Sequence, residues 1–307
     1  MEVWDLRRLL LLRELADRGR LSDVAAALSY SPSAVSQQLA VLEKESGTAL
    51  LEPSGRGVRL TAAGELLVEH ARHLLASGDA ARADLARLMA SDGELRGRMR
   101  FGTLQSAAQR LIIPVVQRLQ GEHPLLRFEL REHEFEAAIP ELRLGGLDVV
   151  ISDEYDGQAR PRPEGTATTV LLEEPLLVLL PSRHRLARPA KPVALADLAA
   201  EPWVASARGT GHHAAVLAHC RALGGFDPDL RHLTNDAMTQ IEAVRSLGAV
   251  GLLPRLALPT RTSGVAARPI AEGSVRRRLF AVTRVGPRPP ALDLVLRELS
   301  AQAAARQ

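Results

Sequence analysis

Residues 21–47 read LSDVAAALSYSPSAVSQQLAVLEKESG, and this stretch decides the fold of the N-terminal domain. The spacing of its apolar residues predicts one helix over 22–28 and a second that begins at Pro32 and ends at Gly47. Ser31 can cap the second helix through its hydroxyl, and a proline in the first helical position loses no hydrogen bond. Two helices joined by a short polar turn form a helix-turn-helix.

The flanking segments complete a winged domain. A leucine-rich helix is expected over 4–18, and short strands are expected over 49–51 and 58–60. The loop 52–57 between the strands contains Pro and Gly, as the tip of a hairpin does. Residues 1–60 are therefore predicted to form an all-α winged helix-turn-helix domain.

A long helix follows, capped by Thr61 and reaching about Ala90, so residues 61–92 are expected to link two domains. Apolar or small residues recur along it with heptad spacing: Leu67, Ala71, Leu74, Gly78, Ala81, Leu85 and Leu88. Such a seam favours a coiled coil between two copies of the chain. The alternative is an ordinary amphipathic helix packed on its own domain, and the pattern leaves it open.

Residues 93–307 alternate strand and helix patterns, which indicates an α/β domain with largely parallel sheets. Strands are expected over 99–102, 126–130, 148–151, 176–180, 203–205, 250–253 and 279–285. Helices are expected over 106–120, 136–144, 195–199, 212–223, 237–247 and 289–303. The Pro-rich segment 161–165 is interpreted as a crossover, which gives a first lobe of about 93–162 and 266–307 and a second lobe of about 163–265.

Composition sets the class of protein. The chain has 307 residues, 46% hydrophobic and 24% charged, which is ordinary for a globular protein. One cysteine, Cys220, excludes an internal disulfide and fits a reducing cytoplasm. The apolar run 9–12 is too short for a signal peptide or a membrane span, so a cytoplasmic protein without a membrane partner is expected. The net charge of +3 favours a polyanionic partner only weakly.

Residues 21–39, with Leu42-Glu43 and Gly47, resemble the LysR-type transcriptional regulators. Residues 55–64, GRGVRLTAAG, match the wing of that family and the cap of its linker helix. The chain departs from the family pattern at Leu51, where an aromatic residue is usual, and at Pro53, where a basic residue is common. The first departure affects packing and the second a phosphate contact.

The resemblance implies a DNA-binding transcription regulator and not an enzyme. Its partners would be a double-stranded DNA operator, a small-molecule effector and further copies of the chain in a homodimer or homotetramer. The C-terminal domain would have the two lobes of a periplasmic-binding-protein fold, with the effector between them. No cofactor and no metal are expected.

Carried over position by position, the groove-facing residues of the family fall on the start of the second helix of the motif. They are Pro32, Ser33, Ser36 and Gln37, with Gln38 beside them. Gln37 can pair with adenine through two hydrogen bonds, and the family often has Arg there, which puts a guanine preference in doubt. Arg56 in the wing is a candidate for a phosphate or minor-groove contact.

Ligands of α/β domains bind at the carboxyl ends of strands and at helix N-termini. This rule selects Thr103, Gln105, Ser106 and Asp153 in the first lobe and Ser206, Arg208, Thr210 and Asp236 in the second. For each of them helix capping is an equal alternative. Both signs of charge are present, so the charge of the ligand stays open.

Other classes of protein are disfavoured. Cys220 follows His219, and adjacent residues do not face each other on a helix, so no nucleophile pair forms. His212 and His219 lie two turns apart, about 10 Å, too far to bind one metal ion. A solute-binding protein would carry a signal peptide and lack a helix-turn-helix. An enzyme would show a convergent set of catalytic side chains, and none is found.

Overall fold

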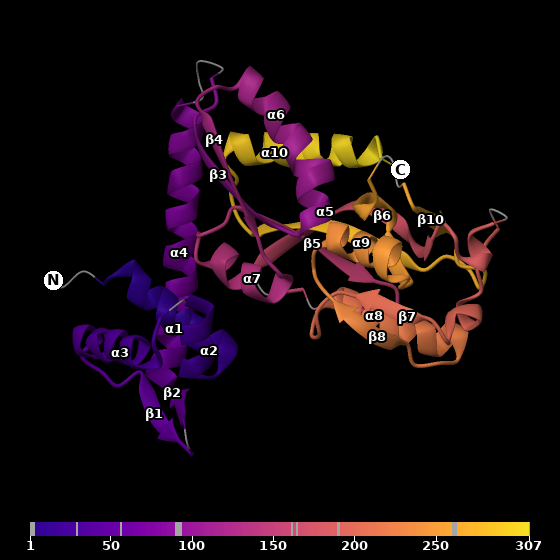
Figure 1. The fold of residues 1–307 in the computed structure, drawn as a ribbon. Helices are drawn as coiled ribbons and strands as arrows, with labels where there is room; N and C mark the ends of the chain where they lie inside the picture. Colours follow the sequence, from indigo (N-terminus) through magenta and orange to yellow (C-terminus); the bar gives the residue numbers. More distant parts are fainter. Residues whose placement is uncertain are drawn as a thin grey trace.

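The computed structural model describes residues 4–28, 30–55, 57–89, 94–160, 162–163, 165–188, 191–259 and 263–306. The chain forms a small N-terminal domain, one long helix and a two-lobed C-terminal domain (Figure 1). The α-helices are α1 (Leu6–Arg18), α2 (Leu21–Leu28), α3 (Pro32–Ser46), α4 (Ala62–Met89), α5 (Gln105–Ala107), α6 (Ile113–Glu122), α7 (Phe135–Arg143), α8 (Gly211–His219), α9 (Ala237–Leu247) and α10 (Pro290–Ala304).

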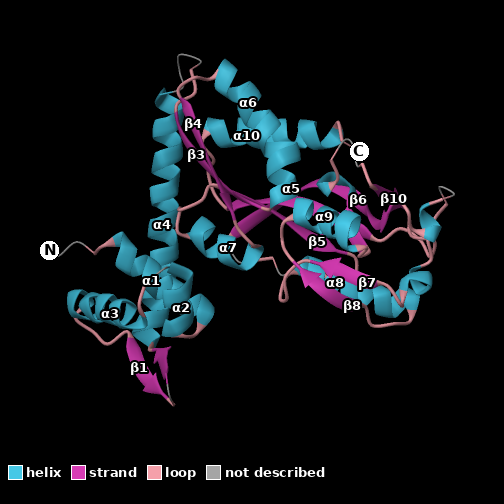
Figure 2. Cartoon of the chain, viewed as in Figure 1, coloured by secondary structure: helices cyan, strands magenta, loops and turns pink. Residues whose placement is uncertain are grey.

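The strands and the shorter helical turns complete the fold (Figure 2). The strands are β1 (Leu51–Ser54), β2 (Gly57–Leu60), β3 (Gly97–Thr103), β4 (Leu126–Glu132), β5 (Val149–Tyr155), β6 (Thr166–Pro181), β7 (Pro202–Ala205), β8 (Asp229–Leu233), β9 (Gly251–Pro254), β10 (Val265–Arg268) and β11 (Arg276–Arg284). The turns are π-helical η1 (Ala108–Ile112) and η4 (Cys220–Gly224), and 3-10 helical η2 (Arg185–Ala187), η3 (Leu195–Leu198) and η5 (Arg255–Ala257).

The N-terminal domain folds as its capping residues predict. The Ser31 hydroxyl accepts a hydrogen bond from the Ala34 N–H at 3.1 Å, and Pro32 opens α3. Gly47 ends the helix in the left-handed conformation that glycine adopts without strain. Apolar side chains from α1, α2, α3 and the start of α4 form one buried core. This core holds α3 with its first turn facing solvent.

The loop at the tip of the wing is shorter than expected, because the strands extend to Ser54 and begin again at Gly57. β1 begins at Leu51, not at residue 49, and Pro53 pairs with Val58 inside the hairpin. The reason is Glu43, whose Oε1 accepts the N–H groups of Leu50 and Leu51 at 2.8 and 2.9 Å. That contact ties the preceding segment to α3, so strand pairing starts later in the chain.

The long helix α4 has two different halves. Leu67 and Ala71, expected in an intermolecular seam, are instead buried in the core of their own domain, because α1 packs against this part of α4. Leu74, Leu85 and Leu88 are 44%, 60% and 71% exposed. The seam prediction was therefore wrong for the first turns of the helix, and the apolar stripe that remains has no partner among the described residues.

The main sheet of the C-terminal domain is mixed, which corrects the expectation of largely parallel sheets. Its order is β10-β6-β11-β5-β3-β4, with β9 also paired to β6. β3 is parallel to β4 and β5, but β11 runs antiparallel to β5 and β6. The last strand of the chain, β11, inserts between β5 and β6, which come earlier in the sequence. The pattern of apolar residues within a strand does not predict whether its neighbours run parallel or antiparallel to it.

One strand, β6, belongs to both lobes. Its residues 166–175 pair with β11, whereas 176–181 pair with β9 and β10. This pairing favours lobe limits near 175 and 275, later than the expected 163 and 266. Each lobe has its own apolar core, and the parallel pair β7–β8 lies in the second lobe. The strands β8 and β10 were not expected from the sequence.

A set of ion pairs joins the N-terminal domain to the first lobe, where α7 lies beside α1 and α4 (Figure 1). Asp17 of α1 pairs with Arg143 of α7 at 3.2 Å and with Arg72 of α4 at 3.0 Å. Asp79 of α4 pairs with Arg284 of β11 at 3.2 Å. We call these five residues the junction network.

Candidate functional site

The first turns of α3 present a polar face to solvent. Pro32, Ser33, Ser36 and Gln37 are all exposed. The Ser33 hydroxyl lies 2.9 Å from that of Ser31, next to the cap. Four neighbouring side chains of a solvent-facing helix start, three of them polar, can meet the edges of bases in a major groove.

Two residues near this face are placed differently. Gln38 is partly buried, and its Oε1 accepts a hydrogen bond from Arg8 Nε of α1 at 3.1 Å, so its side chain joins two helices. Arg56, the expected wing contact, lies outside the described residues. The described wing carries another arginine, Arg59, which pairs with Glu52 at 2.8 Å and is well exposed.

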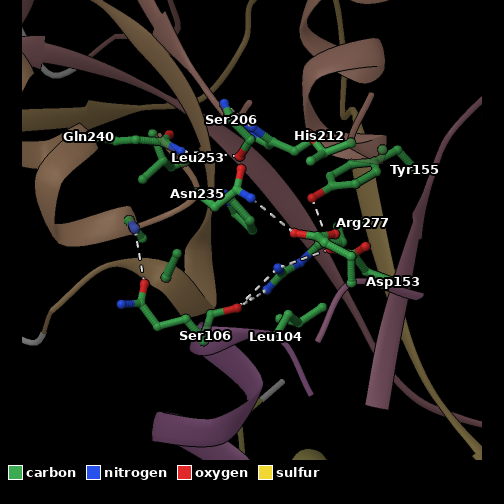
Figure 3. Close-up of a pocket in the computed structure, with 17 residues that line it drawn as sticks. Leu104, Ser106, Asp153, Tyr155, Ser206, His212, Asn235, Gln240, Leu253 and Arg277 are labelled. Carbon is green, nitrogen blue, oxygen red and sulfur yellow. Dashed lines mark hydrogen bonds and ion pairs between the residues drawn. The ribbon is translucent and has the colours of Figure 1, made fainter. Parts of the chain in front are cut away.

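A small cavity of about 80 Å³ lies between the two C-terminal lobes (Figure 3). It has room for several water molecules or a small ligand. First-lobe and hinge-strand side chains on its wall include Gln105, Ser106, Glu134, Asp153, Tyr155 and Arg277. Second-lobe side chains include Ser206, Thr210, His212, Asn235, Gln240 and Leu253.

A buried arginine organises the first wall. Arg277 of β11 is 3% exposed, and its Nε donates to Glu174 Oε1 at 2.9 Å. Its Nη1 donates to the Ser106 hydroxyl at 3.1 Å and to Asp153 Oδ2 at 3.4 Å. Figure 3 shows Ser106 and Asp153 converging on this guanidinium. We call Ser106, Asp153, Glu174 and Arg277 the cleft network.

The charges of the cleft network stabilise one another. Burial by itself would lower the pKa of the Arg277 guanidinium, but Glu174, Tyr155 and Asp153 together more than offset that, so the pKa lies above its usual value. Burial, with a further contribution from Asp153, raises the pKa of the Tyr155 hydroxyl, which donates to Asp153 Oδ2 at 2.9 Å. Tyr155 is therefore a neutral donor.

The second wall is neutral. His212 is buried, with Nε2 2.7 Å from the Leu252 carbonyl and Nδ1 accepting the Ser206 N–H. Burial lowers the pKa of His212, so the ring is uncharged near neutral pH. Gln240 is also buried, and its Nε2 donates to the Ser206 hydroxyl at 3.2 Å and to the Thr234 carbonyl.

Two contacts connect the lobes across the cavity. Gln105 of the first lobe accepts the Ala237 N–H at 3.0 Å and donates to the Asp236 carboxylate. Asn235 of the second lobe donates to Glu134 at 3.3 Å. Burial, followed by the nearby Asp153 charge, raises the pKa of Glu134. These contacts close the cleft in this structure.

The eight residues expected around an effector divide into two groups. Gln105, Ser106, Asp153, Ser206 and Thr210 line the cavity. Thr103 is buried and donates to the Leu104 carbonyl at 3.2 Å, Arg208 is exposed in the loop after β7, and Asp236 caps α9; these three are outside the lining.

The structure shows whether four of these residues cap a helix. The cap position of α5 is Leu104, which makes no side-chain hydrogen bond, so neither Thr103 nor Ser106 caps that helix. Thr210 does cap α8, and Asp236 caps α9, where the Thr239 N–H and the Gln105 side chain lower the pKa of the Asp236 carboxyl.

Sequence reasoning missed the residue at the centre of the site. Arg277 lies in a run of three arginines, 276–278, which reads as an exposed turn before the strand expected at 279. Side chains of a strand alternate between faces, so the middle arginine of such a run points opposite to its neighbours. The acidic pair Glu173-Glu174 was the matching signal, because each of these carboxylates meets one of those arginines.

The described residues do not form a metal site, a reactive thiol or a membrane span. Among the described residues, no three His, Cys, Asp or Glu side chains lie close enough together to hold a metal ion. Cys220 is buried in the second-lobe core, and burial raises the pKa of its thiol to about 12. Within the described ranges no helix is both long and apolar enough to cross a bilayer.

Family models match both parts of the chain. Residues 6–65 match the bacterial regulatory helix-turn-helix protein of the lysR family, and residues 92–304 match the LysR substrate binding domain. The chain belongs to the LysR family. It is a transcriptional regulator with a DNA-binding domain and a ligand-responsive domain, and not an enzyme.

Individual LysR relatives align with most of this chain. The chain is 30% identical over 281 residues to the uncharacterized HTH-type transcriptional regulator YnfL of Escherichia coli, covering 91% of each chain. It is 29% identical over 252 residues to a probable hydrogen peroxide-inducible genes activator of Mycobacterium avium, covering 81% of this chain and 77% of the relative.

A solved LysR structure has the same fold. The LysR regulator CbnR, solved in complex with its target DNA, superposes with a TM-score of 0.56 at 22% identity, covering 97% of this chain and all of that one. The likeness extends through both the winged domain and the two lobes, as the fold expected from the sequence requires.

Proposed function

We propose that the exposed start of α3 reads the operator, with Gln37 as the residue that recognises a base. Gln37 and Ser36 project into solvent from a rigid helix, and Gln37 has the donor and acceptor that match the edge of adenine. Pro32 and Ser33 accompany them at the helix start, and Gln38 positions α3 through Arg8. Arg56 contacts phosphate or the minor groove from the wing.

Binding to operator variants tests this assignment. Gln37→Ala should cost ~1–3 kcal/mol on the best operator and relax the preference at one base pair. Arg56→Ala should weaken binding to all sequences alike and reduce the salt dependence by about one phosphate contact. Ser46→Ala, at the far end of α3, is the control. Unchanged affinity and base preference in Gln37→Ala would exclude this reading face.

The interlobe cavity is the proposed effector site. The observation that carries this proposal is the buried Arg277, held with Ser106 and Asp153 on one wall, opposite Ser206, Thr210 and Gln240 on the other. A ligand that bridges the walls binds both lobes at once. It would therefore stabilise the closed cleft and change the geometry presented to the DNA-binding domain.

A thermal-shift screen of small metabolites on the full chain identifies a ligand, and two serine or threonine variants locate it. Ser106→Ala removes a hydroxyl from the cavity wall, so the ligand-induced rise in Tm should shrink. Thr103→Ala removes a buried hydroxyl outside the lining and should keep the rise. If a confirmed ligand raises the Tm of both variants as much as that of the wild type, the site lies elsewhere.

A redox signal is a less suitable trigger for this chain, although several of its relatives are named for hydrogen peroxide. The Cys220 thiol is buried with its pKa raised to about 12, so almost none of it is the reactive thiolate. Hydrogen peroxide should leave operator binding unchanged, and Cys220→Ser should respond in the same way. A peroxide-dependent change that disappears in Cys220→Ser would favour the redox function.

The exposed stripe on α4 is the proposed dimer contact. Leu74, Leu85 and Leu88 are exposed on a helix whose other faces pack against α1 and the first lobe. Leu74→Asp should convert dimers to monomers in light scattering, whereas His73→Asp adds the same charge beside the stripe and should not. A wild-type monomer at micromolar concentration would exclude this dimer. The cytoplasm, where DNA and metabolites meet, is the proposed location.

A further inference from the structure

A second, larger cavity of about 500 Å³ lies behind the cleft network. It is formed by the middle of β6, the turn η5 with the two residues after it, the turn η1 and Arg306, which follows the end of α10. In Figure 1, α10 ends beside β6 and β10 near the C-terminus. The cavity is separate from the interlobe site, but Glu174 lines it while holding Arg277 on the other side.

The positive charges around this cavity are not matched by free carboxylates. Three arginines reach it, Arg110, Arg255 and Arg306. Within the part of the chain that the structure describes, the side chains of Arg255 and Arg306 make no hydrogen bond or ion pair, and the Arg110 side chain donates only to the Leu258 carbonyl at 2.9 Å.

The two carboxylates on the wall do not neutralise these arginines. Glu173 is paired with Arg278, and Glu174 is paired with Arg277 and accepts the Leu256 N–H. The cavity therefore presents unpaired cationic groups, and like charges in one place favour a bound anion.

The floor of the cavity is apolar. Leu172 and Leu256 are buried there, and Pro175, Leu177, Leu258 and Pro259 are partly buried beside them. Apolar and charged side chains share the wall of this cavity, so a molecule that has both an apolar part and an anionic group suits it. A free inorganic anion would use the arginines but leave this surface in contact with water.

We propose that this cavity is a second ligand site, which takes an organic anion with an apolar body. Its anionic group lies between Arg255 and Arg306, where guanidinium groups donate charge-assisted hydrogen bonds. Its apolar part covers Leu172, Leu256 and Leu258. This site is distinct from the interlobe effector site, so an experiment can exclude one proposal without excluding the other.

The fluorescent anion 1-anilinonaphthalene-8-sulfonate is the probe, titrated into the full chain. The double variant Arg255→Gln, Arg306→Gln should weaken its binding ~10-fold or more, because it loses two charge-assisted hydrogen bonds. The control Arg221→Gln, Arg231→Gln removes the same charge from exposed second-lobe positions and should not weaken it. The neutral analogue N-phenyl-1-naphthylamine should bind the arginine variant and the wild type alike.

Two further measurements separate the apolar and ionic parts. Leu258→Glu should weaken both dyes, because it places a carboxylate on the apolar floor. Octanoate should displace the sulfonate at concentrations where inorganic phosphate does not. Equal binding to the Arg255→Gln, Arg306→Gln variant and its control, or displacement by phosphate as effective as by octanoate, would overturn the proposal.

Discussion

The cleft network and the junction network are both built from arginines and carboxylates, but they differ in burial. In the cleft, Arg277 and Glu174 are 3% and 5% exposed. At the junction, Arg72 is 42% exposed and Asp79 is 28% exposed, whereas Asp17 and Arg143 are only 11% and 13% exposed. Water and salt therefore reach Arg72 and Asp79 at the junction but not the Arg277–Glu174 pair of the cleft.

This difference assigns the two networks different tasks. Removing one member of a buried pair leaves a charge without water or partner, so such a network holds a single arrangement firmly. Half-exposed pairs contribute little each and can exchange their partners for water. The cleft network is suited to fixing a binding wall, and the junction network to a contact that a modest free energy can open.

The largest expected effect comes from breaking the cleft network. Arg277→Met leaves Glu174 and Asp153 buried beside an apolar side chain and should lower the free energy of unfolding by ~3–5 kcal/mol. Urea denaturation measures it. Arg278→Met, the next residue on the same strand but on its exposed face, should cost much less. If both variants lost a similar free energy of unfolding, the buried and exposed faces of β11 would not differ in their contribution to stability.

A smaller effect should appear with pH on the second wall of the cleft. The pKa of His212 in the folded state lies below the unfolded value of 6.5, because the ring is buried. As pH falls below about 6.5 the unfolded chain takes up the proton first, so the stability that His212 contributes is complete above 6.5 and is lost on acidification.

Stability curves between pH 7.5 and pH 5.5 test this sign. The loss on acidification should be reduced in His212→Gln, whose side chain stays neutral and can still donate to the Leu252 carbonyl. His123→Gln is the control, since that residue is only partly buried, at the C-cap of α6 and far from the cleft wall. An acid loss as large in His212→Gln as in the wild type would assign the titration to other groups.

The smallest effect is expected at the junction. Asp17→Asn should lower stability by ~1 kcal/mol or less in dilute buffer, and by less still in 0.5 M NaCl, because Arg72, one of its two partners, remains hydrated. Small-angle scattering should show a more extended chain. Asp84→Asn breaks an exposed pair within α4 and should leave the dimensions unchanged. If Asp17→Asn lowered the free energy of unfolding by more than ~2 kcal/mol regardless of salt, the junction network would behave like the buried cleft network.

The sequence predicts the N-terminal domain well because its signals are local. Ser31, Pro32 and Gly47 each fix a helix end through bonds to residues a few positions away. The helix from 237 to 247 was likewise predicted to the residue, between the Asp236 cap and Gly248. A helix end that depends only on residues a few positions away can be predicted from those residues alone.

The cleft depends on partners far apart in the chain. Arg277 meets Glu174 and Ser106 only because β11 returns between β5 and β6, and neither residue type nor spacing gives that strand order. The same limit explains the seam on α4: the heptad pattern gives an apolar face, but only the docking of α1 shows which turns of that face are already covered. Five of the eight residues expected at the cleft line it, and their positions at strand ends made them predictable.

The helix α7 has one end at the cavity and the other on the DNA-binding domain. Glu134, just before its start, meets Asn235 across the cleft, and Arg143, its last residue, meets Asp17. Nine residues span ~13 Å, so one short helix, with Pro140 in its interior, connects the two surfaces. A hybrid regulator that joins this DNA-binding domain to a foreign sensor must therefore bring a matching arginine on the corresponding helix. A fusion made only at the end of α4 would keep both parts folded and lose the contact between them.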